Sequence, residues 1–134
     1  MRNLIIDQGN SSCKIDLFEG GQSIFHQRVE RLTTDFLAQF ATEHTWEEAI
    51  LSSVVGEDEA LDQWLTEHSK RYIRLSADTQ LPIGNLYKTP KTLGKDRIAV
   101  CVGANHLQPN RNLLVIDAGT AITYDIVNAN NEYV

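Results

Sequence analysis

The stretch IIDQGNS at residues 5–11 has a counterpart, VIDAGTA, at residues 115–121. Each copy consists of an apolar strand, an Asp-x-Gly turn and a small polar residue. With one residue of slip, both copies continue into a second strand that contains an acid, Asp16 or Asp125. A strand that ends near a glycine lets backbone N–H groups approach a phosphate without a Cβ in the way. We therefore interpret the repeat as two phosphate-binding hairpins.

One Asp-x-Gly copy would be weak evidence, because Asp and Gly are common turn residues. The interpretation depends on two copies that follow similar strands. Hydroxyl groups near both turns can donate hydrogen bonds to phosphate oxygens: Ser11, Ser12, Thr120 and Thr123. The aspartates would instead hold a cation or an ordered water. The usual glycine-rich phosphate motifs are missing, since Gly94-Lys95 is followed by Asp96 and no GxGxxG occurs.

Composition limits the classes of protein to consider. With 134 residues, 42% hydrophobic and 22% charged, the chain is of a size and composition typical of one folded domain. Its formal charge of -6 disfavours a general nucleic-acid binder. The first apolar run, 4–6, is too short for a signal peptide or a membrane span, and Cys13 and Cys101 form no CxxC pair. We expect a reducing cytosol, and we interpret Glu57–Glu59 as solvated acids near a helix end.

Hydrophobic periodicity predicts the element order βββαβαβα, followed by two strands and the start of a third. The expected strands are 3–7, 12–18, 22–29, 49–55, 71–75, 113–117, 122–127 and 132–134, and the expected helices are 34–43, 57–69 and 95–106. Residues 76–93 are expected to form a loop, because Pro82, Gly84 and Pro90 interrupt regular structure. This order indicates an α/β fold in which helices cover a mixed sheet.

The order also predicts how the chain divides. We expect a first lobe at 1–110 and the opening hairpin of a second, repeated lobe at 111–134. A return strand that stops at Val134 would leave an exposed sheet edge. We therefore expect the chain to be part of a longer protein.

A basic segment lies between the two hairpins. From Asn85 to Arg97 there are four cations and one acid. Asp96 and Arg97 fall at a predicted helix N-terminus, where backbone N–H groups favour anions. Asp96 could act as a general base toward a substrate hydroxyl, and Arg97 could bind a carboxylate or phosphate. The structural alternative is that Asp96 only stabilises the helix dipole, an effect of about 0.3–1 kcal/mol.

Together these segments resemble the type III pantothenate kinases of the actin/sugar-kinase/Hsp70-like superfamily. Asp7–Ser11 is similar to the family's first phosphate motif, D-x-G-N-[TS], and Asp117–Ala121 to the second, D-x-G-T-A. Tyr87 followed by Gly94–Arg97 resembles the pantothenate segment, G-x-D-R. Order and spacing agree from residue 3 to the end. The resemblance implies a ribonuclease H-like (actin-like ATPase) lobe.

The resemblance also implies an activity, the ATP-dependent phosphorylation of pantothenate to 4'-phosphopantothenate in the first step of coenzyme A biosynthesis. It carries over Asp96 as the catalytic base. The implied pantothenate contacts are Tyr87, Gly94, Lys95, Asp96 and Arg97. The implied ATP contacts are Asp7, Gln8, Gly9, Asn10, Ser11, Ser12, Cys13, Lys14 and Thr120. Asp117 would hold a monovalent cation, potassium or ammonium.

Further partners follow from the same resemblance. ATP would bind with a divalent cation, Mg²⁺, and the full-length protein would be a cytoplasmic homodimer without nucleic-acid or membrane partners. Gln8 departs from the family pattern, which has an apolar residue there, and we expect this to be tolerated. Two other functions remain open: a non-catalytic nucleotide-binding accessory factor for transcription, and a sugar or acetate kinase. The presence of both Asp96 and Arg97 favours an enzyme over the accessory factor, and a substrate screen with ATP would separate the pantothenate enzyme from a sugar or acetate kinase.

Overall fold

The structure, a computed structural model, describes all 134 residues and divides into two compact units, Met1–Leu75 and Ser76–Val134. Each unit has its own mixed sheet with helical cover, which confirms the α/β class. The predicted element order is also confirmed. Two additions, the short strand β6 (Gly84–Asn85) and a 3-10 turn at Pro90–Thr92, fall in the expected loop. None of the helices has the length and apolar character needed to span a membrane.

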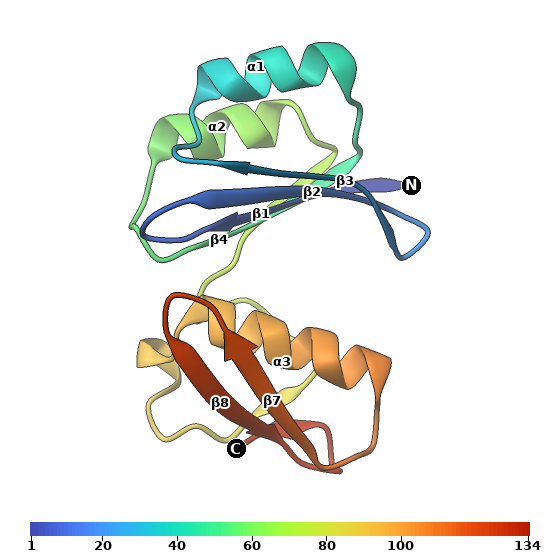
Figure 1. Cartoon of the computed structure of the whole chain (residues 1–134), viewed down its shortest axis with the longest axis vertical. Helices are drawn as coiled ribbons and strands as arrows, with labels where there is room; N and C mark the ends of the chain where they lie inside the picture. The colour runs from blue at the N-terminus through green and yellow to red at the C-terminus, as the bar shows by residue number, and fades with distance from the viewer. The chain divides into compact units, whose positions relative to one another are not determined.

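The first unit is built on a five-stranded sheet with the order β3-β2-β1-β4-β5 (Figure 1). An antiparallel meander comes first, formed by β1 (Arg2–Gln8), β2 (Cys13–Glu19) and β3 (Gln22–Val29). The later strands β4 (Glu48–Ser53) and β5 (Arg71–Arg74) then add in parallel to β1. Parallel addition requires a crossover, which the two helices of this unit provide.

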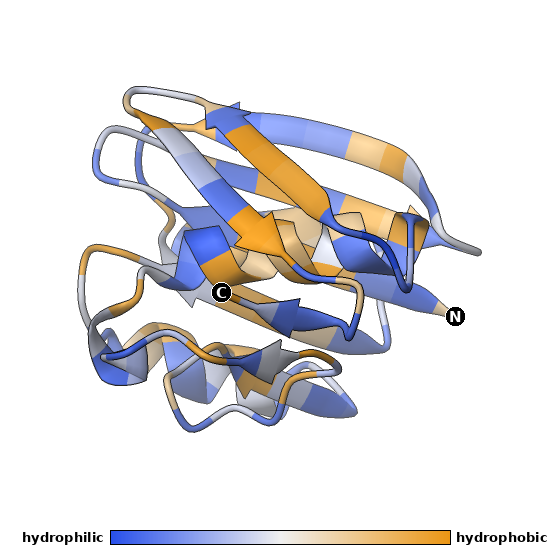
Figure 2. Cartoon of the chain, turned by 90° about the horizontal axis from the view of Figure 1, so that it is seen from below, coloured by the Kyte–Doolittle hydropathy of each residue, from blue (hydrophilic) through white to orange (hydrophobic).

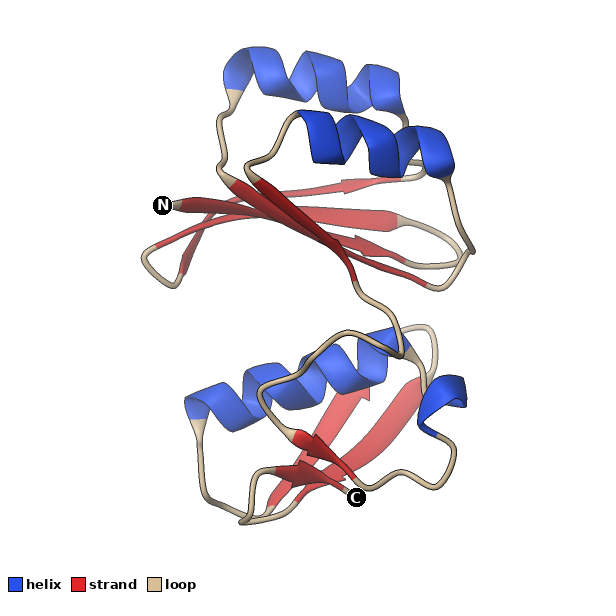
Figure 3. Cartoon of the chain, turned by 180° about the vertical axis from the view of Figure 1, so that it is seen from behind, coloured by secondary structure: helices blue, strands red, loops and turns tan.

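Both helices, α1 (Thr34–Glu43) and α2 (Glu59–Glu67), lie on the same face of that sheet (Figure 3). Their N-caps, Thr33 and Asp58, accept hydrogen bonds from backbone N–H groups of the first turn. Apolar residues alternate along the strands and recur on the helices, as the colours of Figure 2 indicate. The buried core between them includes Leu4, Ile6, Ile15, Leu17, Leu37, Phe40, Leu51, Leu61 and Leu65.

The second unit is a four-stranded sheet with the order β6-β9-β8-β7. The hairpin of β7 (Leu113–Ala118) and β8 (Ile122–Val127) continues into β9 (Glu132–Tyr133), which pairs in parallel with β6. The helix α3 (Lys95–Leu107) packs on β7 and β8. It buries Ile98, Cys101 and Asn105, and Val102 is partly exposed.

The units therefore divide after Leu75, whereas the sequence suggested a boundary after residue 110. The physical reason is the position of α3, whose apolar side chains meet β7 and β8 of the following hairpin. The division of a longer protein into lobes stays a prediction.

Candidate active site

The first hairpin ends in a tight loop of residues 9–12 between β1 and β2. Gly9 N–H donates to the carbonyl oxygen of Ser12 at 2.9 Å. A Cβ added to Gly9 would lie 3.2 Å from that same oxygen, closer than side chains normally approach. The loop thus has the close backbone geometry that the sequence predicted for a phosphate cradle.

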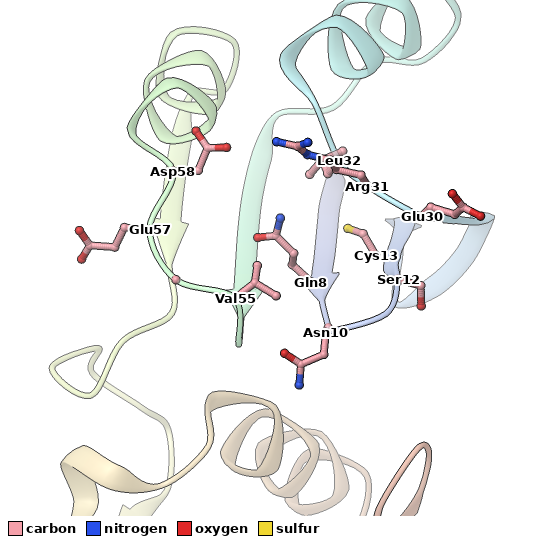
Figure 4. Close-up of a pocket in the computed structure, with 12 residues that line it drawn as sticks. Gln8, Asn10, Ser12, Cys13, Glu30, Arg31, Leu32, Val55, Glu57 and Asp58 are labelled. Carbon is pink, nitrogen blue, oxygen red and sulfur yellow. The ribbon is translucent and has the colours of Figure 1, made fainter.

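This loop forms one wall of a cavity of about 370 Å³ within the first unit. The other walls are the segment 30–32 that follows β3 and the loop 55–58 that precedes α2 (Figure 4). The cavity lies beyond the carboxyl ends of the parallel strands β1 and β4, which is where ligands usually bind in open α/β sheets. Five of the expected ATP residues line it: Gln8, Gly9, Asn10, Ser12 and Cys13. Asp7, Ser11 and Lys14 belong to the same hairpin but are not among the lining residues.

The charged residues of the cavity wall were missed by the sequence interpretation. They are Glu30, Arg31, Glu57 and Asp58. Asp58 is also the N-cap of α2, since its Oδ1 accepts from Leu61 N–H at 3.1 Å. The parallel pairing of β1 with β4 brings Glu57 and Asp58 to the hairpin, and a long-range pairing of that kind leaves no local sequence signal. Three acids against one arginine would oppose a polyphosphate unless a cation accompanied it.

Two side chains of the first hairpin complete the cavity. The Oε1 atom of Gln8 is buried and has no hydrogen-bond partner, so a donor on a bound molecule could satisfy it. Cys13 is 1% exposed. Burial, with a smaller effect of nearby Asp7, raises the pKa of its thiol to about 11. The thiol is therefore neutral near pH 7, and it serves as a packing group of the wall.

The second hairpin repeats this plan with a loop that is one residue shorter, 119–121. Gly119 N–H donates to the carbonyl oxygen of Ala121 at 3.1 Å. The predicted slip of one residue is confirmed, because Asp16 lies opposite Ile5 in one hairpin and Asp125 opposite Val115 in the other. The two acids thus hold equivalent places.

Near this second loop, Asp117 and Thr120 are both exposed. Asp117 lies opposite Thr123, whose buried Oγ1 has no hydrogen-bond partner. The carboxylate of Asp117 makes no hydrogen bond or ion pair, so it is available to a cation. Among the 134 residues no three His, Cys, Asp or Glu side chains gather as a metal site. A cation at Asp117 would therefore take its other ligands from backbone or hydroxyl oxygens and from water.

The basic segment forms the first turn of α3, as predicted. Gly94 is its N-cap residue, and a Cβ there would lie 2.6 Å from Oδ1 of Asp96. A side chain at residue 94 would require that carboxylate to move. Oδ1 accepts a hydrogen bond from Arg97 N–H at 2.9 Å, and Oδ2 makes no hydrogen bond. Asp96 is thus held by its own helix with one oxygen available to accept a proton, while Lys95 is half-buried beside it.

Arg97 has a partner that the sequence did not predict, the buried carboxylate of Asp125 on β8. Its Nε and Nη2 donate to Oδ1 at 3.0 and 2.6 Å, and Nη2 also donates to the Tyr124 carbonyl at 3.3 Å. The Asp125 side chain is 2% exposed and that of Arg97 34%. The hydrogen bond to Asp125 raises the already high pKa of the guanidinium. Nη1 makes no hydrogen bond, so this nitrogen remains for an anionic ligand.

Two tyrosines extend this pair. The hydroxyl of Tyr133 donates to Asp125 Oδ1 at 2.5 Å, and its pKa is raised by burial and by that carboxylate. Tyr87 packs edge-on against Tyr133, with ring centroids 5.9 Å apart and the planes at 72°. Contacts through Tyr133 and Asp125 therefore connect Tyr87 to Arg97, which follows Asp96 in the first turn of α3. The first-hairpin residues belong to the other unit.

Comparison with known proteins gives consistent results. The sequence profile of the type III pantothenate kinases matches residues 3–134. A type III pantothenate kinase of Phocaeicola vulgatus is 40% identical over 131 residues, covering 98% of this chain and 54% of that protein. The corresponding enzyme of Porphyromonas gingivalis is 37% identical over 131 residues, covering 98% and 53%. The chain thus spans about half the length of the curated relatives it matches.

Two solved structures resemble the chain in fold. A Baf family transcriptional activator of Campylobacter jejuni is 24% identical with a TM-score of 0.50, covering 98% of this chain and 51% of that one. An N-acetylmannosamine kinase of Listeria monocytogenes is 17% identical with a TM-score of 0.51, covering 100% and 49%. At these identities the likeness establishes the fold, which agrees with the expected ribonuclease H-like, actin-like ATPase class.

Proposed function

Because the chain belongs to the type III pantothenate kinase family, we propose that the protein transfers a phosphoryl group from ATP to pantothenate, giving 4'-phosphopantothenate. The observation that carries this proposal is the first turn of α3. There Asp96 keeps one carboxylate oxygen without a hydrogen bond, next to an arginine anchored by a buried acid. A fixed proton acceptor beside a fixed cation is what an alcohol-phosphorylating site needs for an anionic acceptor.

In this proposal the first hairpin binds the phosphates of ATP. The Gly9 loop supplies closely approaching backbone, and the hydroxyls and amides of Asn10, Ser11 and Ser12 supply further hydrogen bonds, with Lys14 as a cation nearby. The acidic cavity wall supports a requirement for ATP together with Mg²⁺, because the wall would otherwise repel the phosphates. The cation offsets that repulsion when bound.

The second hairpin contributes Thr120 to the nucleotide and Asp117 to a potassium or ammonium ion. The available carboxylate of Asp117 fits one ligand of such an ion. Asp96 accepts the proton of the acceptor hydroxyl as that oxygen attacks the terminal phosphorus of ATP, whose bond to the bridging oxygen breaks so that ADP leaves. Arg97, Lys95 and Tyr87 orient the substrate. Positioning of this kind accounts for most catalysis in phosphoryl transfer. As the family resemblance implies, we place the enzyme in the cytoplasm as a homodimer.

We also propose that 111–134 open a second lobe of a longer protein. Apolar side chains on one face of β7 and β8 are 52–64% exposed: Leu114, Ile116, Ile122, Tyr124 and Ile126. Such a contiguous apolar face is normally covered. This chain covers 54% of the Phocaeicola vulgatus relative, so a protein of that length has further residues that could cover such a face.

The alternatives have less support. The transcriptional and sugar-kinase names belong to structures whose likeness establishes the fold alone. A non-catalytic accessory factor would not need Asp96 and Arg97 side by side at a glycine-capped helix start. A substrate panel of pantothenate, N-acetylmannosamine and acetate with ATP separates the enzyme classes.

The test uses the complete gene product that contains this chain, with Asp96→Asn and, as a matched control, Asp78→Asn at an exposed acid of the same unit. Asp96→Asn removes the proton acceptor while keeping its shape, so turnover should fall on the order of 10²–10⁴-fold. ATP affinity, measured by calorimetry, should change by less than about twofold. Asp78→Asn should leave both unchanged.

Two results would count against the proposal. Full turnover in Asp96→Asn would remove Asp96 from its role. Absence of pantothenate phosphorylation by the unaltered protein, with another substrate of the panel accepted, would replace the proposed acceptor.

A further inference from the structure

We propose that Asp125 is a positioning residue for the acceptor site, acting together with Tyr133. This inference rests on the proposed function and deepens it, because it concerns how the pantothenate contacts are held. Oδ1 of Asp125 receives all three of its hydrogen bonds, two from Arg97 and one from Tyr133. Asp125 itself is 3% exposed, so it cannot be a substrate contact of its own.

The carboxylate fixes Arg97 in a specific orientation. The side-on contact uses Nε and Nη2, and the Tyr124 carbonyl takes a further hydrogen bond from Nη2. These bonds lock the guanidinium plane and leave Nη1 as the group without a protein partner. A guanidinium held in this way loses less entropy when it binds an anion than a mobile one does. Asp125 therefore determines which nitrogen Arg97 presents to the pantothenate carboxylate.

Tyr133 extends the effect to the second aromatic contact. Its hydroxyl donates to Asp125, and its 2% exposed ring packs against the edge of Tyr87. One buried acid thus supports both Arg97 and, through Tyr133, Tyr87.

Because Asp125 belongs to β8, it also connects the first turn of α3 to the hairpin that carries Asp117 and Thr120. Asp125 thus fixes the acceptor residues, whereas the second phosphate loop is closed by its own hydrogen bond from Gly119 N–H to the Ala121 carbonyl oxygen.

The experiment compares Asp125→Asn and Tyr133→Phe with Asp16→Asn in the complete gene product. Asp125→Asn keeps the shape and removes the charge, whereas Tyr133→Phe keeps the ring against Tyr87 and removes the hydroxyl. Asp16 holds the equivalent place in the first hairpin, where it accepts from Ser23 and contacts His26 at the surface. Steady-state KM and kcat for pantothenate and for ATP are measured separately, with pantothenate affinity by calorimetry.

Asp125→Asn should raise KM and Kd for pantothenate by about tenfold or more, since it weakens a charged hydrogen-bonded pair, and KM for ATP should stay within about twofold. Tyr133→Phe should raise the same pantothenate constants by a few-fold, and Asp16→Asn should change none. If Asp125→Asn raised KM equally for pantothenate and ATP, or lowered only kcat in proportion to the folded fraction, the positioning role would be overturned. The proposed function would remain intact in either case. Failure of the unaltered protein to bind pantothenate would overturn both.

Discussion

The two hairpins share one register but have opposite faces covered. Pairing places four apolar residues of the first hairpin opposite one another on a single face, and four more occupy the equivalent places in the second. The equivalent pairs are Leu4 and Leu114, Ile6 and Ile116, Ile15 and Tyr124, and Leu17 and Ile126. The four of the first hairpin are at most 1% exposed, and their counterparts are 52–64% exposed. The same apolar face is therefore buried in the first unit and exposed in the second.

The position of the helices in the chain explains this difference. In the first unit α1 and α2 follow the hairpin and cover the face of Leu4. In the second unit α3 precedes its hairpin and covers the other face, with Val115, Asp125 and Val127 beneath it. A period-two pattern thus defines two faces, and the order of the elements decides which face is covered. The face of the second hairpin under α3 also carries the polar residues Asp117, Thr123 and Asp125, and Arg97 neutralises Asp125.

The largest contrast is expected from truncating the equivalent leucines in this chain. Leu4→Ala should lower the free energy of unfolding by about 2–5 kcal/mol, because it leaves a cavity in a packed core. Leu114→Ala should change it by less than about 0.5 kcal/mol, because Leu114 is 64% exposed. Urea denaturation checks this, with tryptophan fluorescence following the first unit, where Trp46 and Trp64 lie, and circular dichroism following both.

The same pair of variants tests the proposed second lobe. In the complete gene product the cost of Leu114→Ala should rise toward that of Leu4→Ala, if downstream helices cover its face. An equally small cost in the longer protein would contradict that cover. A large cost in residues 1–134 alone would show that the face is already protected, for example by association of two copies.

A smaller contrast is expected at the two loop glycines. Gly9→Ala would bring its Cβ within 3.2 Å of the Ser12 oxygen, whereas Gly119→Ala would meet the Ala121 oxygen at an ordinary 3.8 Å. Straining the hydrogen bond in the first loop should cost about 1 kcal/mol, and Gly119→Ala should be close to neutral. Thermal denaturation resolves the difference, since about 1 kcal/mol lowers Tm by roughly 4–8 °C in a domain of this size. Equal shifts would show that the two loops are equally tight.

The smallest contrast is expected from the thiols, which should behave alike in both units. Burial raises the pKa of Cys13 and of Cys101 from 9.0 to about 11. The folded state therefore favours the neutral thiol, so its stabilising effect is full below pH 9 and is lost as pH rises toward 11. Between pH 8 and 10 the free energy of unfolding should fall, and Cys13→Ala should reduce that slope in the first unit. A slope unaffected by Cys13→Ala would exclude this thiol as its source.

Most of the fold could be predicted from sequence, because its signals are local. The helix at 34–43 and the strand at 122–127 were predicted at their observed bounds. The order of strands within each sheet depends on pairing between distant residues. The parallel contact of β6 with β9 left no such signal, so 84–85 was expected to be loop.

The candidate site shows the same limit. Motif spacing identified Asp96, Arg97 and the two glycine loops, but not the partner of Arg97. Asp125 was recognised as a repeated acid, and only the packing of α3 on β8 brings it to the guanidinium. Likewise, Glu57 and Asp58 read locally as helix-end acids, and their place in the cavity wall follows from the pairing of β1 with β4. The roles of the site residues stay predictions.

The pairing of β6 with β9 also sets an order of events during synthesis. Every pairing of the first sheet can form once residue 74 has left the ribosome. Tyr87 lies in the segment that connects β6 to α3, and Asp96 lies in the first turn of α3. Strand β6 has no partner strand until residues 132 and 133 have been synthesised. Arg97 must likewise await Asp125, and Tyr87 must await Tyr133. A nascent chain therefore holds the formed cavity of the first unit well before Tyr87 and Arg97 have their partners.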